Sequence, residues 1–258
     1  MTTIAETQSV ARRGAHPSST TRIWRVVKLQ FTNSWNILVL PVLILGAIFV
    51  LNYAIWVIAF RSSDMSENAL DGTQYSGSTI FIFAYMLVVA IQAINLTFPF
   101  ALGYGATRRD YYLGTSLTWL ILSAILTLGI AICGQLETWT NGWGLRATFF
   151  NAVYFGDDSF AARMFTVFAA FLFFFFVGTA SAAVYVRWRA NGLIVAGLVL
   201  AVLLVGAVAL ISFTDSWKGV GEWFAVTGGT GVVAWSLVVT AIAAVTGFFI
   251  LRRATPKS

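Results

Sequence analysis

Residues 37–60 read ILVLPVLILGAIFVLNYAIWVIAF, an apolar stretch without a charged side chain. At about 1.5 Å per residue, a helix of this length crosses the roughly 30 Å hydrocarbon core of a bilayer. Backbone groups in lipid must find hydrogen-bond partners within the chain, and a helix satisfies all of them locally. The stretch therefore predicts a transmembrane helix.

Five further apolar stretches follow, at 79–102, 111–133, 164–186, 192–213 and 230–251. Hydrophobic residues make up 59% of the 258 residues and charged residues 10%, whereas soluble domains carry about 25% charged residues. We expect an all-α, polytopic membrane protein with six transmembrane helices. Its predicted parts are a disordered cytoplasmic tail at 1–20, a membrane domain at 21–252 and a cytoplasmic tail at 253–258.

The basic residues are distributed unevenly over this arrangement. Twelve of the sixteen Lys and Arg residues fall on one side, in the N-terminal region, two alternate connections and the C-terminus. Because cytoplasmic loops accumulate Lys and Arg, this pattern predicts a multi-pass plasma-membrane protein with both termini in the cytoplasm. The net charge of +6 then reflects topology, and we expect no nucleic-acid partner.

A different pattern precedes the first span. Within residues 21–35, Ile23, Val27 and Phe31 recur at every fourth position, with Trp24 beside them and Arg22 among the residues expected on the other face. An apolar stripe at this spacing is typical of an amphipathic helix that lies at the membrane interface in contact with lipid.

The predicted spans hold none of the 26 charged residues. Ion-driven carriers and voltage sensors keep ionisable groups at membrane depth, so coupling of that kind is disfavoured. The chain has no GxxxxGK[ST] loop for ATP. A single histidine and a single cysteine disfavour a metal site or a Cys–His nucleophile. We expect no catalysis and no cofactor or metal in this chain, so its driving force must come from a partner.

The connection between the second and third spans, at 103–112, reads GYGATRRDYY. Gly103 or Gly105 can adopt a positive φ and end the preceding helix. Thr107 lies three residues before Asp110, a spacing that can cap the next helix. The result is a rigid helical elbow. It is either a turn whose arginines follow the charge rule or a docking point for a cytoplasmic ATPase.

The interfacial helix, the six spans and the segment FALGYGATRRDYYLG at 100–114 together resemble the permease subunits of ABC exporters (type V-like) whose ATPase is a separate chain. The resemblance implies a coupling loop that contacts the ATPase, made of Gly105, Thr107, Arg108, Arg109 and Asp110. It also implies ATPase subunits that bind ATP and magnesium, and a second permease copy or paralogue. One departure is that the family often has a re-entrant hairpin between spans five and six, whereas the longest outer loop here, 134–163, lies between spans three and four.

Two other functions stay open from the sequence: a non-transporting membrane scaffold or assembly factor, and an intramembrane enzyme that modifies lipid. The polar groups of the spans are equally open to two interpretations. Gln92 and Asn95 precede Pro99, which can kink the helix. With Asn52 they form either a hinge and polar pathway or ordinary contacts between helices.

Aromatic residues are also abundant. The phenylalanine-rich fourth span is either packed against helices and lipid or part of an aromatic substrate site. Tryptophans of the outer loops are expected to anchor the chain at the membrane interface; they are Trp139, Trp143, Trp217 and Trp223.

Overall fold

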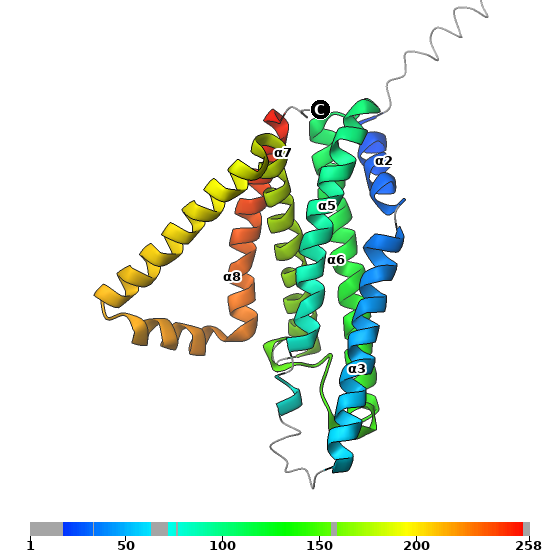
Figure 1. Cartoon of the computed structure of the whole chain (residues 1–258), viewed down its shortest axis with the longest axis vertical. Coiled ribbons are helices and arrows are strands. Elements are labelled where there is room, and N and C mark those ends of the chain that lie inside the picture. The colour runs from blue at the N-terminus through cyan, green and yellow to red at the C-terminus, as the bar shows by residue number, and fades with distance from the viewer. Residues whose placement is uncertain (1–17, 33, 63–71, 76, 156–158, 255–258) are drawn as a thin grey trace, which may run out of the picture.

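The computed structural model describes residues 18–32, 34–62, 72–75, 77–155 and 159–254, and every regular element in these ranges is helical. Five of the described helices are long and apolar enough to cross a membrane (Figure 1). They are α3 (Leu40–Ser62, which follows the π-helix η1, Trp35–Val39), α5 (Phe81–Gly103), α6 (Arg108–Trp139), α7 (Phe160–Phe213) and α8 (Trp217–Arg253). The all-α class is confirmed, and the five helices indicate a multi-pass membrane protein.

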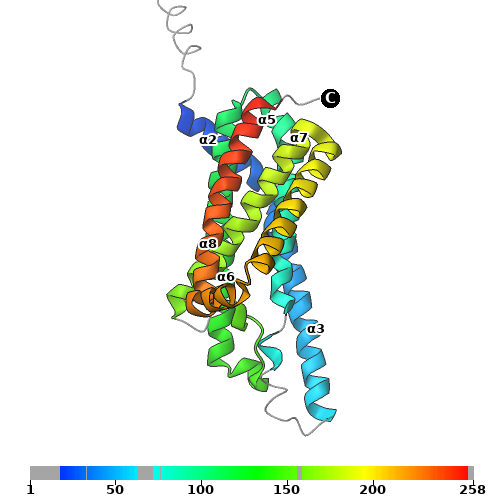
Figure 2. The same ribbon diagram turned by 90° about the vertical axis from the view of Figure 1, so that its left-hand side faces the viewer.

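Aromatic side chains pack the centre of the bundle, in which α3, α5, α6 and the first part of α7 run side by side (Figures 1 and 2). The indole of Trp119 stacks on Phe175 with ring centroids 4.7 Å apart. Its Nε1 donates to Thr179 Oγ1 at 2.9 Å. Phe83 lies 4.6 Å from Phe171, centroid to centroid. These phenylalanines therefore pack between helices.

Element α7 covers the two spans predicted at 164–186 and 192–213, and it consists of two helical legs joined at a kink. At 1.5 Å per residue, each leg, 160–188 and 190–213, is long enough to cross the hydrocarbon core. The helix breaks at Arg189, which has φ 60° and ψ −154°. The expected loop is thus a one-residue break. The second leg, 190–213, leaves the bundle (Figure 1).

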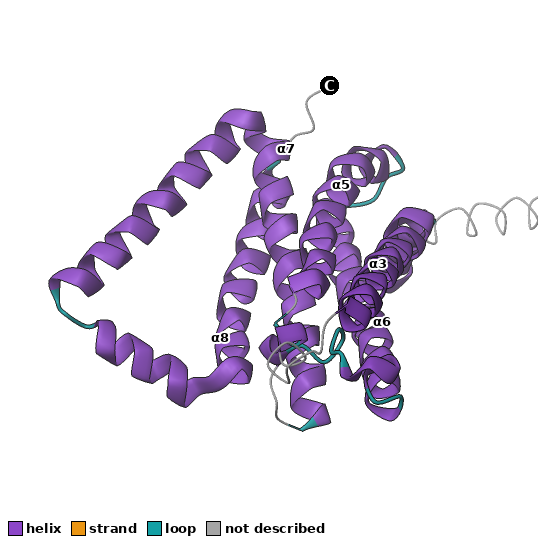
Figure 3. Ribbon diagram, turned by 60° about the horizontal axis from the view of Figure 1, so that its bottom comes forward, coloured by secondary structure: helices purple, strands orange, loops and turns teal. Residues whose placement is uncertain are grey.

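Helix α8 contains a similar break at Gly228, with φ 64° and ψ 175°. Residues 217–227, predicted as loop, form a short helical segment across the far end of the second leg of α7 (Figures 1 and 3). Residues 229–253 then return alongside the first leg of α7. Helix α6 also extends beyond its predicted end at 133 to Trp139, which brings Glu137 into the helix.

The helix before the first span, α2, covers Ser19–Phe31 and is shorter than the predicted 21–35. Ser18 begins it, because its Oγ accepts from Thr21 N at 3.3 Å. The helix thus begins two residues before the predicted boundary between the tail and the membrane domain, and residues 1–17 and 255–258 lie outside the described ranges. Helix α2, the α5–α6 connection, the Arg189 break and the C-terminal end of α8 gather at one end of the molecule, which we call the basic end (Figures 1 and 2).

Candidate functional site

The connection between α5 and α6 has the helix stop and the helix N-cap that its residues predict. Gly105 has φ +79°. Its N–H donates to Leu102 O, and the N–H of Ala106 donates to Ala101 O, both at 3.0 Å, which is a Schellman ending. Thr107 Oγ1 then accepts from Asp110 N at 3.1 Å. The glycine stop and the threonine cap are both confirmed. Residues 103–110, the elbow, therefore form a fixed turn between two helices.

Asp110 attaches the elbow to α2. Its side chain is only 4% exposed, and it accepts hydrogen bonds from Arg22 Nε at 2.7 Å and Ser19 Oγ at 3.1 Å. Arg22, predicted on the face away from the apolar stripe, lies at the seam where α2 packs on α6. Asp110 is thus a buried structural group, unavailable for direct contact with a partner.

The surroundings of Asp110 stabilise its negatively charged form. It precedes the apolar stretch 111–133, so it lies at the end of the membrane-crossing part of α6. Burial on its own raises the pKa of a carboxyl. Here the hydrogen bonds of Thr107 and Ser19, with the charge and hydrogen bond of Arg22, outweigh that effect and leave the pKa of Asp110 below its ordinary value.

The two arginines of the elbow have different surroundings. Arg108 Nη1 donates to the carbonyl of Arg252 at 3.0 Å, in the last turn of α8, where carbonyls lack partners within the helix. Arg109 is exposed and makes no hydrogen bond or ion pair with the described residues. Arg108 therefore joins the elbow to α8, while Arg109 stays available to a partner.

Close packing holds α2 against α6. A Cβ on Gly114 would lie 2.6 Å from Val26 Cβ and 2.9 Å from the carbonyl of Ile23, so only glycine permits this approach. Val27 is buried beside Val26, whereas Trp24 is 49% exposed. The predicted interfacial helix thus buries one face in the protein and keeps its tryptophan outside. Ile23 and Phe31 are half-buried.

A buried glutamine, which the residue pattern had not singled out, connects three helices below the elbow. Gln30 is 2% exposed, and its Nε2 donates to Thr115 Oγ1 at 3.2 Å and to Thr97 Oγ1 at 3.4 Å. The hydroxyls of Thr97 and Tyr111 are 2.7 Å apart. The sequence does contain a sign of this network. Gln30 lies three residues after Val27 and is therefore a polar residue on the apolar stripe of α2.

The four residues of the predicted hinge and polar pathway, Asn52, Gln92, Asn95 and Pro99, have different surroundings. Helix α5 continues through Pro99 to Gly103. Asn52 Nδ2 donates to Ile48 O of its own helix at 2.9 Å, and Asn95 Oδ1 is buried without a hydrogen-bond partner in the described part of the chain. Of the four predicted residues, only Gln92 lines a groove of about 300 Å³ between α2, the start of the first span and α5.

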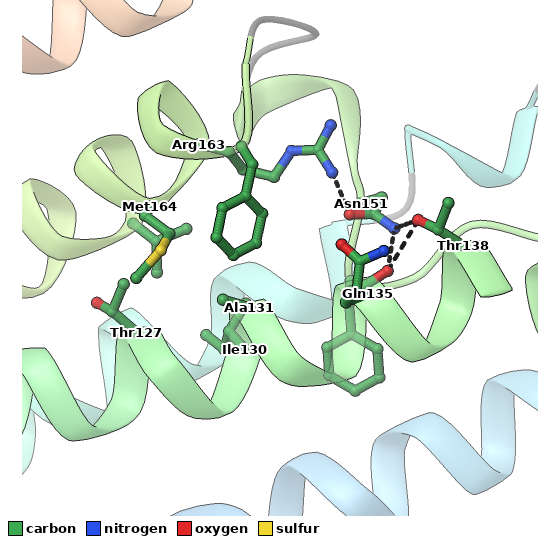
Figure 4. A pocket seen from close by; sticks show the side chains of 12 residues that line it. Thr127, Ile130, Ala131, Gln135, Thr138, Asn151, Arg163 and Met164 are labelled. Atoms are coloured by element: carbon green, nitrogen blue, oxygen red, sulfur yellow. Dashed lines mark hydrogen bonds between the residues drawn. The ribbon is translucent and has the colours of Figure 1, made fainter.

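A small cavity lies at the opposite end of the bundle, between α6 and α7 (Figure 4). Arg163 Nη1 donates to Asn151 Oδ1 there, and Asn151 Nδ2 contacts Thr138 Oγ1 at 3.3 Å. The cavity measures about 30 Å³, enough for one or two water molecules. It is therefore too small to hold a transported solute.

Glu137, near the C-terminal end of α6, is a second buried carboxylate, only 3% exposed. Its oxygens accept from the backbone N–H groups of Phe149, Phe150 and Asn151 at 2.9–3.1 Å. Trp143, predicted as a membrane anchor, donates its Nε1 to the same carboxylate at 3.1 Å. The sequence predicted Glu137 in the outer loop 134–163, and no residue pattern identifies three backbone amides as its partners.

The two buried carboxylates of α6 are separated by 27 residues, from Asp110 to Glu137. That distance is about 40 Å along a helix, longer than the hydrocarbon core is thick. Both groups therefore lie near the membrane surfaces. The described residues also contain no cluster of His, Cys, Asp or Glu that could hold a metal ion.

Comparison with known proteins gives no relative: no protein-family model, no curated protein and no solved structure matches the chain.

Proposed function

We propose that this chain is the permease subunit of an ABC exporter, energised by a separate cytoplasmic ATPase that binds ATP and magnesium. In this proposal six segments cross the membrane: η1 with α3, then α5, α6, the two legs of α7, and residues 229–253 of α8. The basic end faces the cytoplasm, as the distribution of Lys and Arg predicts.

The observation that carries the proposal is the set of contacts made by the elbow. Asp110 bonds to Arg22 of α2, and Arg108 bonds to the carbonyl of Arg252 of α8. The elbow itself is the junction of α5 and α6. A force applied there reaches four helices through direct contacts. Arg109 is an exposed positive charge at this junction, available for an acidic surface on an ATPase.

The second leg of α7 supports a paired arrangement of permeases. Residues 193–208 are exposed on every face of the helix, because this leg stands away from the bundle (Figure 1). A second copy or a paralogue would cover part of this surface. The pathway would then lie between the two permeases.

The test compares Arg109→Glu with Lys28→Glu, an equal charge change at an exposed position of α2. Each full-length variant is purified from its native membranes, and copurifying ATPase is quantified by mass spectrometry and by ATP turnover. We expect Arg109→Glu to lower copurification and turnover at least tenfold, while Lys28→Glu retains both. Arg108 is a less informative site because its loss also breaks the contact with α8.

Two results would contradict the proposal. If the wild-type chain purifies without any ATPase, it is not an ABC permease, and if Arg109→Glu behaves as Lys28→Glu does, the elbow is not the docking point. A scaffold would copurify with membrane proteins without ATP-stimulated turnover. An enzyme that modifies lipid would be active as a purified single chain without nucleotide.

A further inference from the structure

The basic end contains a groove between α2 and the end of α5, with a volume of about 390 Å³. One wall carries Arg22 and Arg25, and the floor and opposite wall include Leu29, Phe100 and Tyr104. The exposed indole of Trp24 is on the same helix, and indoles favour the level of the lipid headgroups. The groove therefore opens at the membrane surface.

The guanidinium groups of this wall have unused donors. Arg25 is exposed and forms no hydrogen bond or ion pair within the described ranges. Arg22 uses its Nε for Asp110, and its two Nη atoms have no partner among the described residues. The planar fork of arginine matches the oxygens of a phosphate group. One side of the groove is thus suited to a phosphate.

The rest of the lining is apolar and continues toward the membrane interior. Leu29 borders both this groove and the 300 Å³ groove beside Gln30. A soluble anion would gain nothing from such a surface, whereas an acyl chain would. The cytoplasmic leaflet contains anionic phospholipids that are attracted to basic segments at its surface.

We propose that this groove binds one anionic phospholipid of the cytoplasmic leaflet. Its phosphate contacts Arg25 and the free Nη atoms of Arg22, and an acyl chain lies along Leu29 and Phe100. The bound lipid holds α2 beside the elbow and so stabilises the junction. This inference uses the membrane orientation proposed above but requires neither an ATPase nor transport.

The experiment uses the full-length protein, delipidated in detergent, and native mass spectrometry with phosphatidylglycerol or phosphatidylcholine of equal chain length. We expect the wild type to favour phosphatidylglycerol at least fivefold and Arg25→Gln to lose that preference. Lys28→Gln removes the same charge from an exposed position of α2 outside the groove lining. Arg253→Gln removes it from a separate groove between α7 and α8. Both controls are expected to keep the preference.

Several results would overturn the assignment. Absence of any preference in the wild type excludes the site, and an equal loss in all three variants shows only a general charge effect. Binding of glycerol 3-phosphate as tightly as the lipid would assign the groove to a soluble phosphate. If Arg25→Gln keeps lipid binding but loses copurifying ATPase, the groove belongs to the protein partner. Conversely, Arg109→Glu should change ATPase binding and leave lipid binding unchanged, which separates this inference from the proposed function.

Discussion

The two ends of α6 each contain a buried carboxylate, but different groups hold them. At the basic end, Asp110 is bound by the side chains of Arg22 and Ser19, which belong to another helix. At the opposite end, which the proposed orientation places outside and which we call the outer end, Glu137 is bound by three backbone amides and one indole of the loop that follows α6. The first arrangement connects two separate elements, while the second closes a loop onto its own helix.

This difference indicates which end can move. Side-chain contacts between two helices can break and re-form during a small shift of α2. The outer loop, in contrast, has positive φ at three non-glycine residues, Asn141, Trp143 and Arg146. Such conformations persist only where the surroundings determine them strongly, and Glu137 supplies that constraint. The outer loop is therefore a fixed cap and the seam between α2 and α6 a joint, which fits the proposed entry of force from the cytoplasm.

The largest effect should come from removing the outer carboxylate. Glu137→Ala leaves four N–H donors without their acceptor, and hydrogen bonds to a charged group contribute about 1.5–3 kcal/mol each without adding in full. We expect a loss of about 3 kcal/mol or more in the free energy of unfolding. Thermal unfolding of the purified protein in detergent measures it.

Two matched variants sharpen this comparison. Glu137→Gln keeps one acceptor oxygen and should lose clearly less stability than Glu137→Ala. Glu222→Ala removes an exposed carboxylate of α8 and should change stability by no more than about 0.5 kcal/mol. If Glu137→Ala unfolds at the same temperature as Glu222→Ala, the outer cap does not depend on this group.

An intermediate effect is expected at the seam between α2 and α6. In Gly114→Ala the new methyl group would meet Val26 Cβ at 2.6 Å, and overpacking of this kind costs about 1–3 kcal/mol. Gly129 lies on the same helix, and a Cβ there would meet no neighbouring atom within 4 Å. Gly129→Ala should therefore be neutral or slightly stabilising, because alanine favours helices. Limited proteolysis of α2, together with thermal unfolding, distinguishes the two; equal behaviour would show that α2 is not tightly packed.

The smallest effect belongs to the ion pair at the basic end. Asp110→Asn keeps the side-chain shape but removes the charge that Arg22 contacts. Because the Arg22 side chain is 33% exposed, solvent weakens the attraction and the expected loss is about 1 kcal/mol. A double-mutant cycle with Arg22→Gln should show coupling between the two positions. If the two substitutions have independent effects on stability, the Arg22–Asp110 ion pair contributes nothing to the joint between α2 and α6.

This contribution should also depend on pH. The pKa of Asp110 is lower in the folded protein than its ordinary value, so its stabilisation is complete above the ordinary aspartate pKa of about 3.9 and is lost as pH falls through the folded value. The stability difference between wild type and Asp110→Asn should therefore be constant near pH 7 and shrink in acid. A difference that grows in acid would contradict this assignment.

Local features of the chain were predictable to different degrees. The Gly105 stop and the Thr107 cap follow from residues within one turn of each other, and the structure confirms both. The connections at 187–191 and 214–229 were predicted as loops, because they are short of apolar residues. The structure keeps most of these residues helical. The first connection turns at Arg189, whereas the second turns at 214–216, where Asp215 has φ 48°, and again at Gly228.

The sequence by itself determined the all-α membrane class, the asymmetric charge distribution and the elbow, because each depends on the composition or spacing of neighbouring residues. Only the tertiary structure decided that Arg22 meets Asp110 across 88 positions, that Gln30 joins three helices, and that Glu137 is enclosed by amides. Such pairings depend on which helix faces approach one another. Which faces meet is a property of the packed bundle as a whole, and residue patterns within one helix do not report it.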